Sequence, residues 1–394
     1  MADAPARPCR RVLMTTDAVG GVWDYSLELA RGLSRHGVAI DLATMGPPPT
    51  GPQKALAIGI PGLALLESRF RLEWMADPET DLVRAGDWLL GLARQRRPDI
   101  IHLNGYAHAA LPWPAPVLVV AHSCVLSWWQ AVHRAPAPPE WAPYATRVAR
   151  GLAAADLVVA PTRAMLTSLA ALYGPMRRSR VIANGRDPRQ WRPLPKDPII
   201  FSAGRLWDPA KNVGALEAVA GRLDWPVVVA GDWRRPEGGG TPPRSLTALG
   251  VITPERMHLG LGKAAVFALP ARYEPFGLAV LEAALCEAVL VLGDIPTLRE
   301  LWRGAALFVR PDDHAALRRA LSALAASPRL RRRLGHAARL RAQSYTTRRM
   351  VAAYLDVYRE LRAVPDQRSF MPPSVPGWLG HGATSRPAFL GPSG

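Results

Sequence analysis

The chain of 394 residues has few cysteines and no long apolar run, and each shortage excludes a class of protein. Its three cysteines, Cys9, Cys124 and Cys286, are odd in number and scattered, which argues against a disulfide framework and against a zinc site. We expect them to be reduced. The most apolar stretch, LAVLEAALCEAVLVLG, contains Glu282 and Glu287, so no segment is predicted to span a bilayer.

The N-terminal segment MADAPARPCRR has no apolar region of the signal-peptide type, and it predicts a cytoplasmic protein. The net charge of +17 calls for solvent or for an anionic partner, which would be a nucleic acid, an acidic membrane or a phosphorylated small molecule. Lysine is scarce, and the many arginines are mixed with acidic residues along the chain. A nucleic-acid surface would instead be clustered and interleaved with aromatic residues, so we expect no nucleic acid partner.

The densest basic cluster lies at residues 329–343, where the spacing of the apolar residues predicts a helix. Leu330, Leu334, Ala337 and Leu340 fall on one face, which we expect to be packed against the core while the arginines face outward. Peripheral contact of this basic face with an anionic membrane is a secondary interpretation.

Short apolar runs alternate with amphipathic helical patterns along most of the chain, which predicts parallel sheets covered by helices on both faces. The length suffices for two such domains. The proline-rich residues 45–53, MGPPPTGPQ, are predicted to be a loop. The strands are predicted at residues 11–15, 38–44, 99–103, 117–121, 157–160, 199–202, 227–230, 265–269, 289–292 and 306–309.

Shifts in composition predict the domain boundaries. We expect an N-terminal α/β domain at 1–185, a linker rich in proline and charge at 186–198, and a second α/β domain at 199–345. A C-terminal helix at 346–362 is followed by a tail at 363–394, which is rich in proline, glycine and serine and is predicted to be disordered.

Glycine and histidine residues follow several predicted strands, at the sheet edge where ligands of parallel sheets bind. Gly20 and Gly21 would let backbone amides approach a phosphate, although a Gly-Gly pair is more often only a turn. His102 and His122 each end an apolar strand. A histidine in that position is usually structural, and that is our interpretation of His102.

A carboxylate interrupts the apolar face of the helix predicted near residue 280. Leu278, Leu281 and Leu285 fall at i, i+3 and i+7 of a core-facing stripe, but the i+4 position is Glu282. A buried unpaired carboxylate costs several kcal/mol, so Glu282 must have hydrogen-bond donors. The hydroxyls of a sugar, or an arginine or solvent at the edge of the stripe, are equally good candidates.

The residues before this helix predict a tight turn from strand to helix. Pro275 is expected in the first helical turn, and Gly277 relaxes the backbone around it. The free N–H groups of such a helix end attract phosphate.

Glu274 and Glu282, which are separated by seven residues and enclose Pro-Phe-Gly-Leu, resemble the E-x7-E motif of retaining nucleotide-sugar glycosyltransferases of family 4 (group 1). The resemblance covers about residues 11–362 and implies the GT-B fold, in which two Rossmann-like domains have parallel sheets that face each other across a cleft. It also implies an enzyme that moves a sugar, with retention, from a nucleoside diphosphate sugar bound by the C-terminal domain to an acceptor on the N-terminal domain.

The same resemblance assigns roles to the residues of the motif. It implies that Glu274 contacts the donor sugar and that the backbone at Phe276, Gly277 and Leu278 contacts the sugar and diphosphate. Glu282 would hold the ribose hydroxyls.

Four strings outside the motif also resemble the family. Arg205 and Lys211, in AGRLWDPAKN, resemble its basic pair that clamps the diphosphate, and His122, in VLVVAHS, resembles a histidine beside the donor sugar. Gly20 and Gly21 resemble the loop that faces the donor phosphate. The final helix resembles the segment that crosses back to the N-terminal domain.

No cofactor and no metal are expected, because no D-x-D pair ends a predicted strand. The acceptor is an unidentified glycan, lipid or small molecule, and residues 124–143, with their tryptophans, are either an acceptor-binding loop or a covered connection. A GT-B nucleotide-sugar epimerase and a non-catalytic module that binds nucleic acid or membrane are the alternatives.

Overall fold

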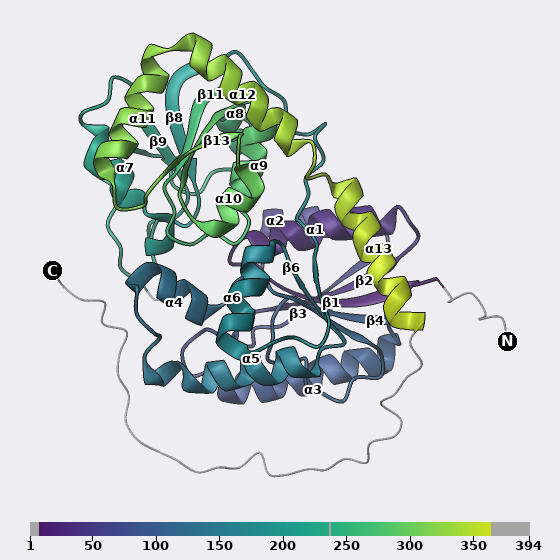
Figure 1. Ribbon diagram of the computed structural model, residues 1–394. Coiled ribbons are helices and arrows are strands. Elements are labelled where there is room, and N and C mark those ends of the chain that lie inside the picture. The colour runs from purple at the N-terminus through teal and green to yellow at the C-terminus, as the bar shows by residue number, and fades with distance from the viewer. Residues whose placement is uncertain (1–7, 236–237, 364–394) are drawn as a thin grey trace. The chain divides into compact units, whose positions relative to one another are not determined.

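The computed structural model describes residues 8–235 and 238–363, which form two all-parallel sheets (Figure 1). The predicted tail lies outside the described residues, apart from Ala363. The seven-stranded sheet has the order β3 (Leu63–Glu67), β2 (Ala39–Met45), β1 (Arg11–Asp17), β4 (Ile100–Leu103), β5 (Val117–Val120), β6 (Leu157–Ala160) and β7 (Ser179–Val181). The six-stranded sheet has the order β10 (Thr247–Ala248), β9 (Val227–Ala230), β8 (Asp197–Ala203), β11 (Ala264–Leu269), β12 (Val289–Gly293) and β13 (Ala306–Val309).

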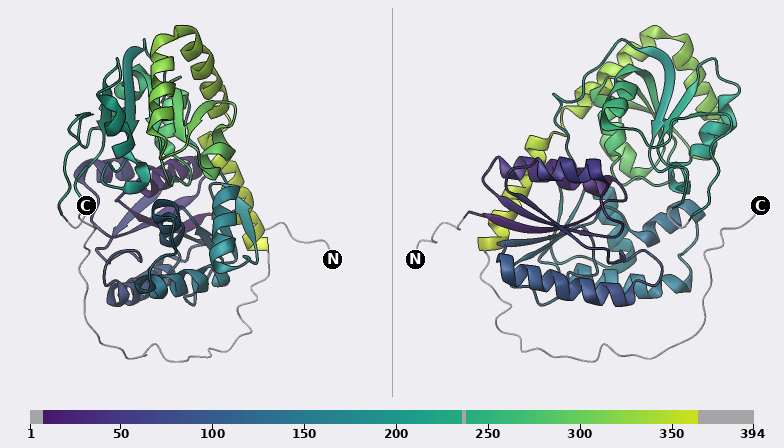
Figure 2. Two further views of the ribbon diagram at one scale, coloured as in Figure 1. Left: turned by 60° about the vertical axis from the view of Figure 1, so that its left-hand side comes forward. Right: turned by 180° about the vertical axis from the view of Figure 1, so that it is seen from behind.

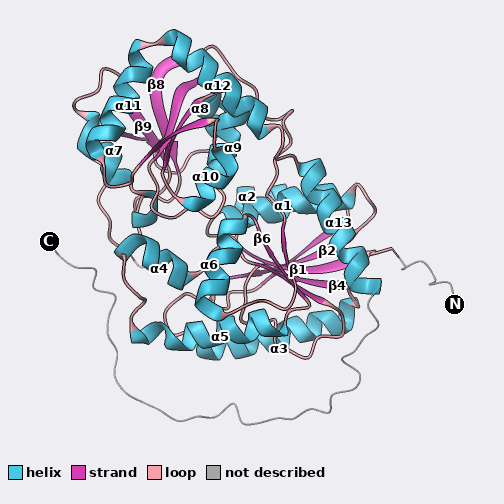
Figure 3. Cartoon of the chain, in the orientation of Figure 1, coloured by secondary structure: helices cyan, strands magenta, loops and turns pink. Residues whose placement is uncertain are grey.

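Helices flank both faces of each sheet (Figures 2 and 3). We call the seven-stranded sheet and its helices the N-terminal lobe, and the six-stranded sheet and its helices the C-terminal lobe. The N-terminal lobe contains α1 (Gly21–Ser34), α2 (Gly51–Ile58), α3 (Glu79–Arg96), α4 (Val125–His133), the 3-10 turn η1 (Pro139–Trp141), α5 (Ala142–Ala154) and α6 (Arg163–Tyr173). The C-terminal lobe contains the 3-10 turn η2 (Pro209–Lys211), α7 (Val213–Ala220), α8 (Pro254–Lys263), α9 (Leu278–Leu285), α10 (Pro296–Trp302), α11 (His314–Ala326) and α12 (Pro328–Ala342).

The central strands are continuous apolar runs because both of their faces are buried. Alternate residues of β5 enter different cores: Leu118 packs with residues of α1, and Val119 packs with residues of α3, α5 and α6. The helix α13 (Thr347–Ala363) belongs to the first of these cores, where Tyr354 and Tyr358 are fully buried. The final helix therefore packs on the core of the N-terminal lobe.

Each sheet has one point at which the strand order reverses, and ligands of such sheets bind in the crevice at that point. In the N-terminal lobe the reversal lies between β1 and β4, and in the C-terminal lobe it lies between β8 and β11. The residues that follow β1, β8 and β11 are the glycine pair, Arg205 and Glu274. The topology thus places sequence-predicted site residues at both switch points.

Residues 182–196, which connect the two sheets, contain no helix or strand apart from a bridge between Arg186 and Thr346. At this bridge a side chain on Gly185 would meet the Thr346 backbone at 2.4 Å, so only glycine fits there. The predicted domain boundaries stay predictions, although the long connection agrees with a linker near residue 190.

The prediction of a loop at residues 45–53 was partly wrong, since α2 begins within it. Thr50 caps this helix and forms a capping box with Gln53, and Pro52 occupies the first turn, where its missing N–H has no effect. The following strand β3 was not predicted.

The predicted core face of the basic helix was partly wrong. Leu330 and Leu334 pack against the core of the C-terminal lobe as predicted, whereas Leu340 does not. In α12 the buried residues are Gly335, Ala338 and Ala342, while the Leu340 side chain is 53% exposed. The close approach of α12 to the rest of the lobe explains this choice, because a side chain at Gly335 would meet the Glu287 carbonyl oxygen at 2.6 Å. None of the helices within the described ranges is both apolar and long enough to cross a membrane.

Candidate active site

Arg205 follows β8 and is held in place by Asp208. The guanidinium donates a hydrogen bond of 2.8 Å to Oδ2 of Asp208 and lies over the ring of Trp207. Oδ1 of Asp208 accepts 2.9 Å from the Ala210 amide and so caps η2, which ends at Lys211. Since the Arg205 side chain is 41% exposed, its charge remains accessible to an anionic ligand.

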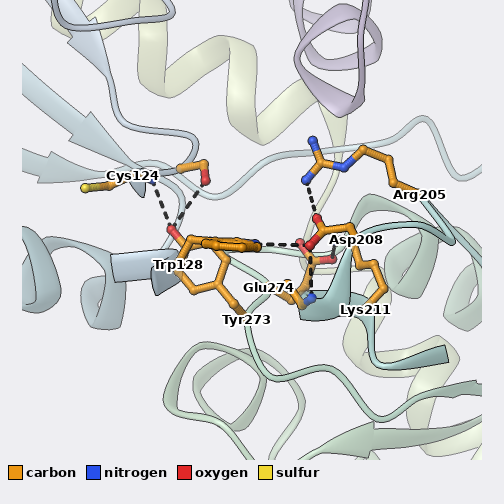
Figure 4. A network of polar contacts seen from close by, with 9 residues as sticks. Cys124, Trp128, Arg205, Asp208, Lys211, Tyr273 and Glu274 are labelled. Atoms are coloured by element: carbon orange, nitrogen blue, oxygen red, sulfur yellow. Dashed lines mark hydrogen bonds and ion pairs between the residues drawn. The ribbon is translucent and has the colours of Figure 1, made fainter. Parts of the chain in front are cut away.

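Lys211 pairs with Glu274, the first acid of the E-x7-E motif. Nζ of Lys211 lies 2.6 Å from Oε2 of Glu274, and both side chains are nearly buried. The Glu274 carbonyl oxygen also accepts 2.6 Å from the hydroxyl of Thr297 in α10. Two independent contacts therefore fix the acid and its backbone, as Figure 4 shows for the ion pair.

Gly277 ends the turn that leads into α9, and its φ of 87° lies in the left-handed region that glycine tolerates. The helix begins at Leu278, so Pro275 lies before the helix and not in its first turn as predicted. No side chain caps this helix. Its first N–H groups are therefore free to bind an anion.

Glu282 is buried on α9, and Arg186 is its partner. Nε of Arg186 donates 2.7 Å to Oε1 of Glu282, and the guanidinium lies 3.9 Å from Glu28 on α1. Burial raises the pKa of Glu282 to about 7, against the opposing charge of Arg186. Of the partners expected for this carboxylate, the structure shows an arginine, which is Arg186. The contact with ribose hydroxyls stays a prediction.

The glycine pair lies against the C-terminal lobe. Gly20 is the N-cap of α1, which has no side-chain cap, and a side chain there would come within 3.8 Å of a terminal nitrogen of Arg205. A side chain on Gly21 would lie 3.5 Å from the Leu278 side chain. Two uncapped helix N-termini, those of α1 and α9, thus meet beside Arg205.

His122 follows β5 in the N-terminal lobe. Its Nε2 lies 2.8 Å from Oδ1 of Asn104, and its ring contacts the edge of Tyr25. Because the amide oxygen only accepts, Nε2 carries the proton. Burial lowers the pKa of His122 to about 3, so the imidazole is neutral at pH 7 and offers Nδ1 as a hydrogen-bond acceptor.

His102 is structural, as the sequence suggested. It is fully buried and lies between the hydroxyls of Tyr358, at 2.7 Å, and Tyr25, at 3.3 Å. Burial, with a smaller contribution from His122, lowers the pKa of His102 to about 3.

A pocket of about 60 Å³ opens in the N-terminal lobe at the carboxyl ends of β1 and β4. Its polar lining includes Thr16, Asp17, Arg71, Glu73 and Asn104. The Glu73 carboxylate is held by the amides that follow Gly105, and burial raises its pKa. Asn104 joins this pocket to His122. In the described part of the chain, no three His, Cys, Asp or Glu side chains gather as a metal site would require.

Arg186, Asp208 and Tyr273 of this region were not predicted to be functional, and Trp128 was predicted only as part of a possible acceptor-binding loop. An Asp-Pro pair ahead of Lys211 is an N-cap signal that was available in the sequence. The others make contacts with residues 80 to 149 positions away, and no local pattern announces such a partner.

Family comparisons agree with this geometry. Residues 19–190 match the family model described as Glycosyltransferase Family 4. Residues 184–341 match the model described as Glycosyl transferases group 1. The α-maltose-1-phosphate synthase of Mycobacterium tuberculosis is 28% identical over 250 residues, which cover 53% of this chain and 64% of that protein. The match thus spans less than two thirds of that relative. The D-inositol 3-phosphate glycosyltransferase of Xylanimonas cellulosilytica is 29% identical over 407 residues, which cover 88% of this chain and 93% of that protein.

Solved structures show the same fold. The sucrose-phosphate synthase of Thermosynechococcus elongatus superposes with a TM-score of 0.73 at 21% identity, covering 90% of this chain and 99% of that one. Anabaena HepE in complex with UDP and glucose superposes with a TM-score of 0.69 at 13% identity, covering 89% of this chain and 100% of that one. With two parallel sheets in the GT-B arrangement, the E-x7-E motif at the second switch point and both halves matched, this chain belongs to family 4 of the retaining, nucleotide-sugar-dependent glycosyltransferases.

Proposed function

We propose that the chain transfers a sugar from a UDP-sugar to a small polyhydroxylated acceptor, with retention. The observation that carries this proposal is the meeting of the uncapped N-termini of α1 and α9 beside Arg205. Backbone N–H groups and helix dipoles at two such ends, together with a guanidinium, suit a ligand with two adjacent phosphates. UDP is the nucleotide named for HepE, and its fold likeness supports the choice of base.

Arg205 and Lys211 take up the charge that develops on the departing diphosphate, which is the largest electrostatic demand of the reaction. Glu274, held by Lys211 and Thr297, orients the donor sugar. Because these fixed groups can neutralise the diphosphate, transfer needs no divalent cation. Activity in excess chelator tests this point, and abolition by chelator with rescue by magnesium or manganese would contradict it.

The proposed chemistry proceeds on one face of the sugar. The bond between the anomeric carbon and the diphosphate oxygen breaks, the acceptor oxygen bonds to the same face, and the acceptor proton passes to the departing phosphate. His122, with its pKa of about 3, is too weak a base to take that proton at pH 7. It instead contacts the sugar through Nδ1.

The acceptor is proposed to enter the pocket of the N-terminal lobe. Asp17 and Glu73 can accept hydrogen bonds from hydroxyls, and Arg71 can pair with a phosphate. Two relatives are named for products or acceptors of this kind, a maltose 1-phosphate and an inositol 3-phosphate. Residues at this pocket, not in the donor region, should therefore decide the acceptor.

A panel of nucleotide sugars tests the function. Thermal unfolding and release of nucleotide are followed with each sugar, first alone and then with inositol phosphates and hexose phosphates as acceptors. The proposal predicts stabilisation by UDP-sugars and faster release of UDP when one acceptor is present. Isomerisation of the donor without any acceptor would favour an epimerase instead.

A further inference from the structure

One helix of the N-terminal lobe, α4, makes hydrogen bonds to both charged parts of the donor region (Figure 4). The indole Nε1 of Trp128 donates 3.0 Å to Oδ1 of Asp208, the carboxylate that holds Arg205. At the start of the same helix, the amide of Cys124 donates 3.1 Å to the hydroxyl of Tyr273, the residue before Glu274.

These contacts satisfy groups that the fold otherwise leaves without a partner. Cys124 is the N-cap of α4, and no side chain of the helix caps it. The Tyr273 hydroxyl supplies an acceptor there, and the Ser127 hydroxyl lies 2.9 Å from the same oxygen. Burial raises the pKa of Tyr273 to about 12, so its hydroxyl stays neutral.

The contacts form a closed circuit. Trp128 donates a hydrogen bond to Asp208, which pairs with Arg205 and caps the turn that ends at Lys211. Lys211 pairs with Glu274. Tyr273, which precedes Glu274, accepts a hydrogen bond from the amide of Cys124 at the start of α4. Asp208 is 2% exposed, so its hydrogen bonds are shielded from water and strong. At the far end of α4, Arg134 pairs with Asp312 of the C-terminal lobe.

We infer that Trp128 and Tyr273 are positioning residues of the transfer reaction: Trp128 fixes Arg205 through Asp208, and Tyr273 fixes Glu274. The inference rests on the proposed function. In the free protein α4 therefore connects the acceptor-bearing lobe with the groups that stabilise the leaving diphosphate. Of residues 124–143, those at the start of α4 are packed against the donor region, whereas most of residues 133–143 are exposed, so the choice between an acceptor-binding loop and a connection stays open for that part.

The test compares Trp128→Phe, Asp208→Ala, the double variant and Tyr273→Phe with Trp129→Phe. The ring of Trp129 contacts Trp128 and His133 on the same helix. Release of nucleotide from the nucleotide sugar that the wild type turns over fastest gives kcat and KM. We expect Trp128→Phe and Tyr273→Phe each to lower kcat about tenfold, with KM changed less than threefold. Trp128→Phe removes the hydrogen bond to the Asp208 carboxylate, and Tyr273→Phe removes the hydrogen bond between α4 and the residue before Glu274. Both kcat and KM of Trp129→Phe should stay within about twofold of the wild-type values.

The double variant separates positioning from packing. If Trp128 acts through Asp208, Trp128→Phe has no further effect in the Asp208→Ala background, in which the indole N–H has lost its acceptor. Additive losses, or a wild-type kcat in both Trp128→Phe and Tyr273→Phe, would overturn the inference while the function stands. A wild-type protein that turns over no nucleotide sugar would overturn the proposed function and, with it, the positioning role. Thermal unfolding of each variant checks that it folds.

Discussion

The two switch points present different groups to a ligand. At the C-terminal one, Arg205 is paired with Asp208, and Lys211 is paired with Glu274. At the N-terminal one, Asn104 after β4 is joined by a hydrogen bond to His122 after the neighbouring strand β5, and the adjoining pocket adds Asp17, Arg71 and Glu73. This difference suggests a division of work, in which the C-terminal lobe handles the charge of the diphosphate and the N-terminal lobe handles the hydroxyls of the sugar and acceptor.

The largest effect is expected from removing the cations of the C-terminal switch point. Arg205→Ala and Lys211→Ala should each lower kcat/KM by roughly 100- to 1,000-fold, the loss typical of a group that stabilises developing charge. Steady-state release of nucleotide measures it. Arg222→Ala, which changes an exposed arginine after α7, is the control. Full activity in both site variants would remove the charge-handling role from this lobe.

A smaller and more selective effect is expected at the other switch point. His122→Ala should lower kcat about 10- to 100-fold, because it removes a hydrogen bond made to the sugar as it reacts. The affinity for free UDP should not change. Calorimetry and turnover are compared with those of His36→Ala, an exposed histidine in the same lobe. A variant with wild-type turnover would make His122 a structural histidine like His102.

Glu282→Gln should weaken binding of the nucleotide sugar about 10- to 100-fold, since a charged acceptor for two ribose hydroxyls is worth roughly 1.5–3 kcal/mol. Calorimetry with the sugar donor measures this loss. The variant also breaks the pair with Arg186, so its unfolding must be followed in parallel. Unchanged affinity in a destabilised protein would return Glu282 to a structural role.

The smallest effect concerns the pH dependence of stability. His102 has a folded-state pKa of about 3, below its ordinary value of 6.5, so only the unfolded state binds its proton between these values. Stability should therefore fall as the pH decreases from 6.5. Between pH 7 and pH 5 the unfolding free energy of His102→Gln should fall about 2 kcal/mol less than that of the wild type. Equal losses in urea unfolding would show that His102 is protonated in the folded protein.

Sequence patterns predicted most of the sheets because parallel strands buried on both faces are continuous runs of apolar residues. The strands at 157–160, 227–230 and 306–309 were predicted to the residue. Strand β3 was missed; it lies at the edge of its sheet and is only partly buried, so it lacks the both-faces-buried setting of the central strands. On α12 the core contacts of Leu330 and Leu334 were predicted, but the fully buried positions were missed because glycine and alanine pack more closely than leucine.

For the site, the sequence was informative where a local string carries the contact. The motif around Glu274 and the pair Arg205 and Lys211 were predicted in this way, and in the structure Lys211 pairs with Glu274. Contacts such as that between Trp128 and Asp208 depend on how two distant segments fold, and side-chain chemistry alone cannot reveal them.

The most direct test of the division of work is calorimetric titration of UDP into the wild type, Arg205→Ala and His122→Ala under one set of conditions. The account predicts that UDP affinity falls at least about tenfold in Arg205→Ala, because a charge-assisted contact to the diphosphate is lost, and stays at the wild-type value in His122→Ala. Equal affinity in all three proteins, or a loss confined to His122→Ala, would contradict it.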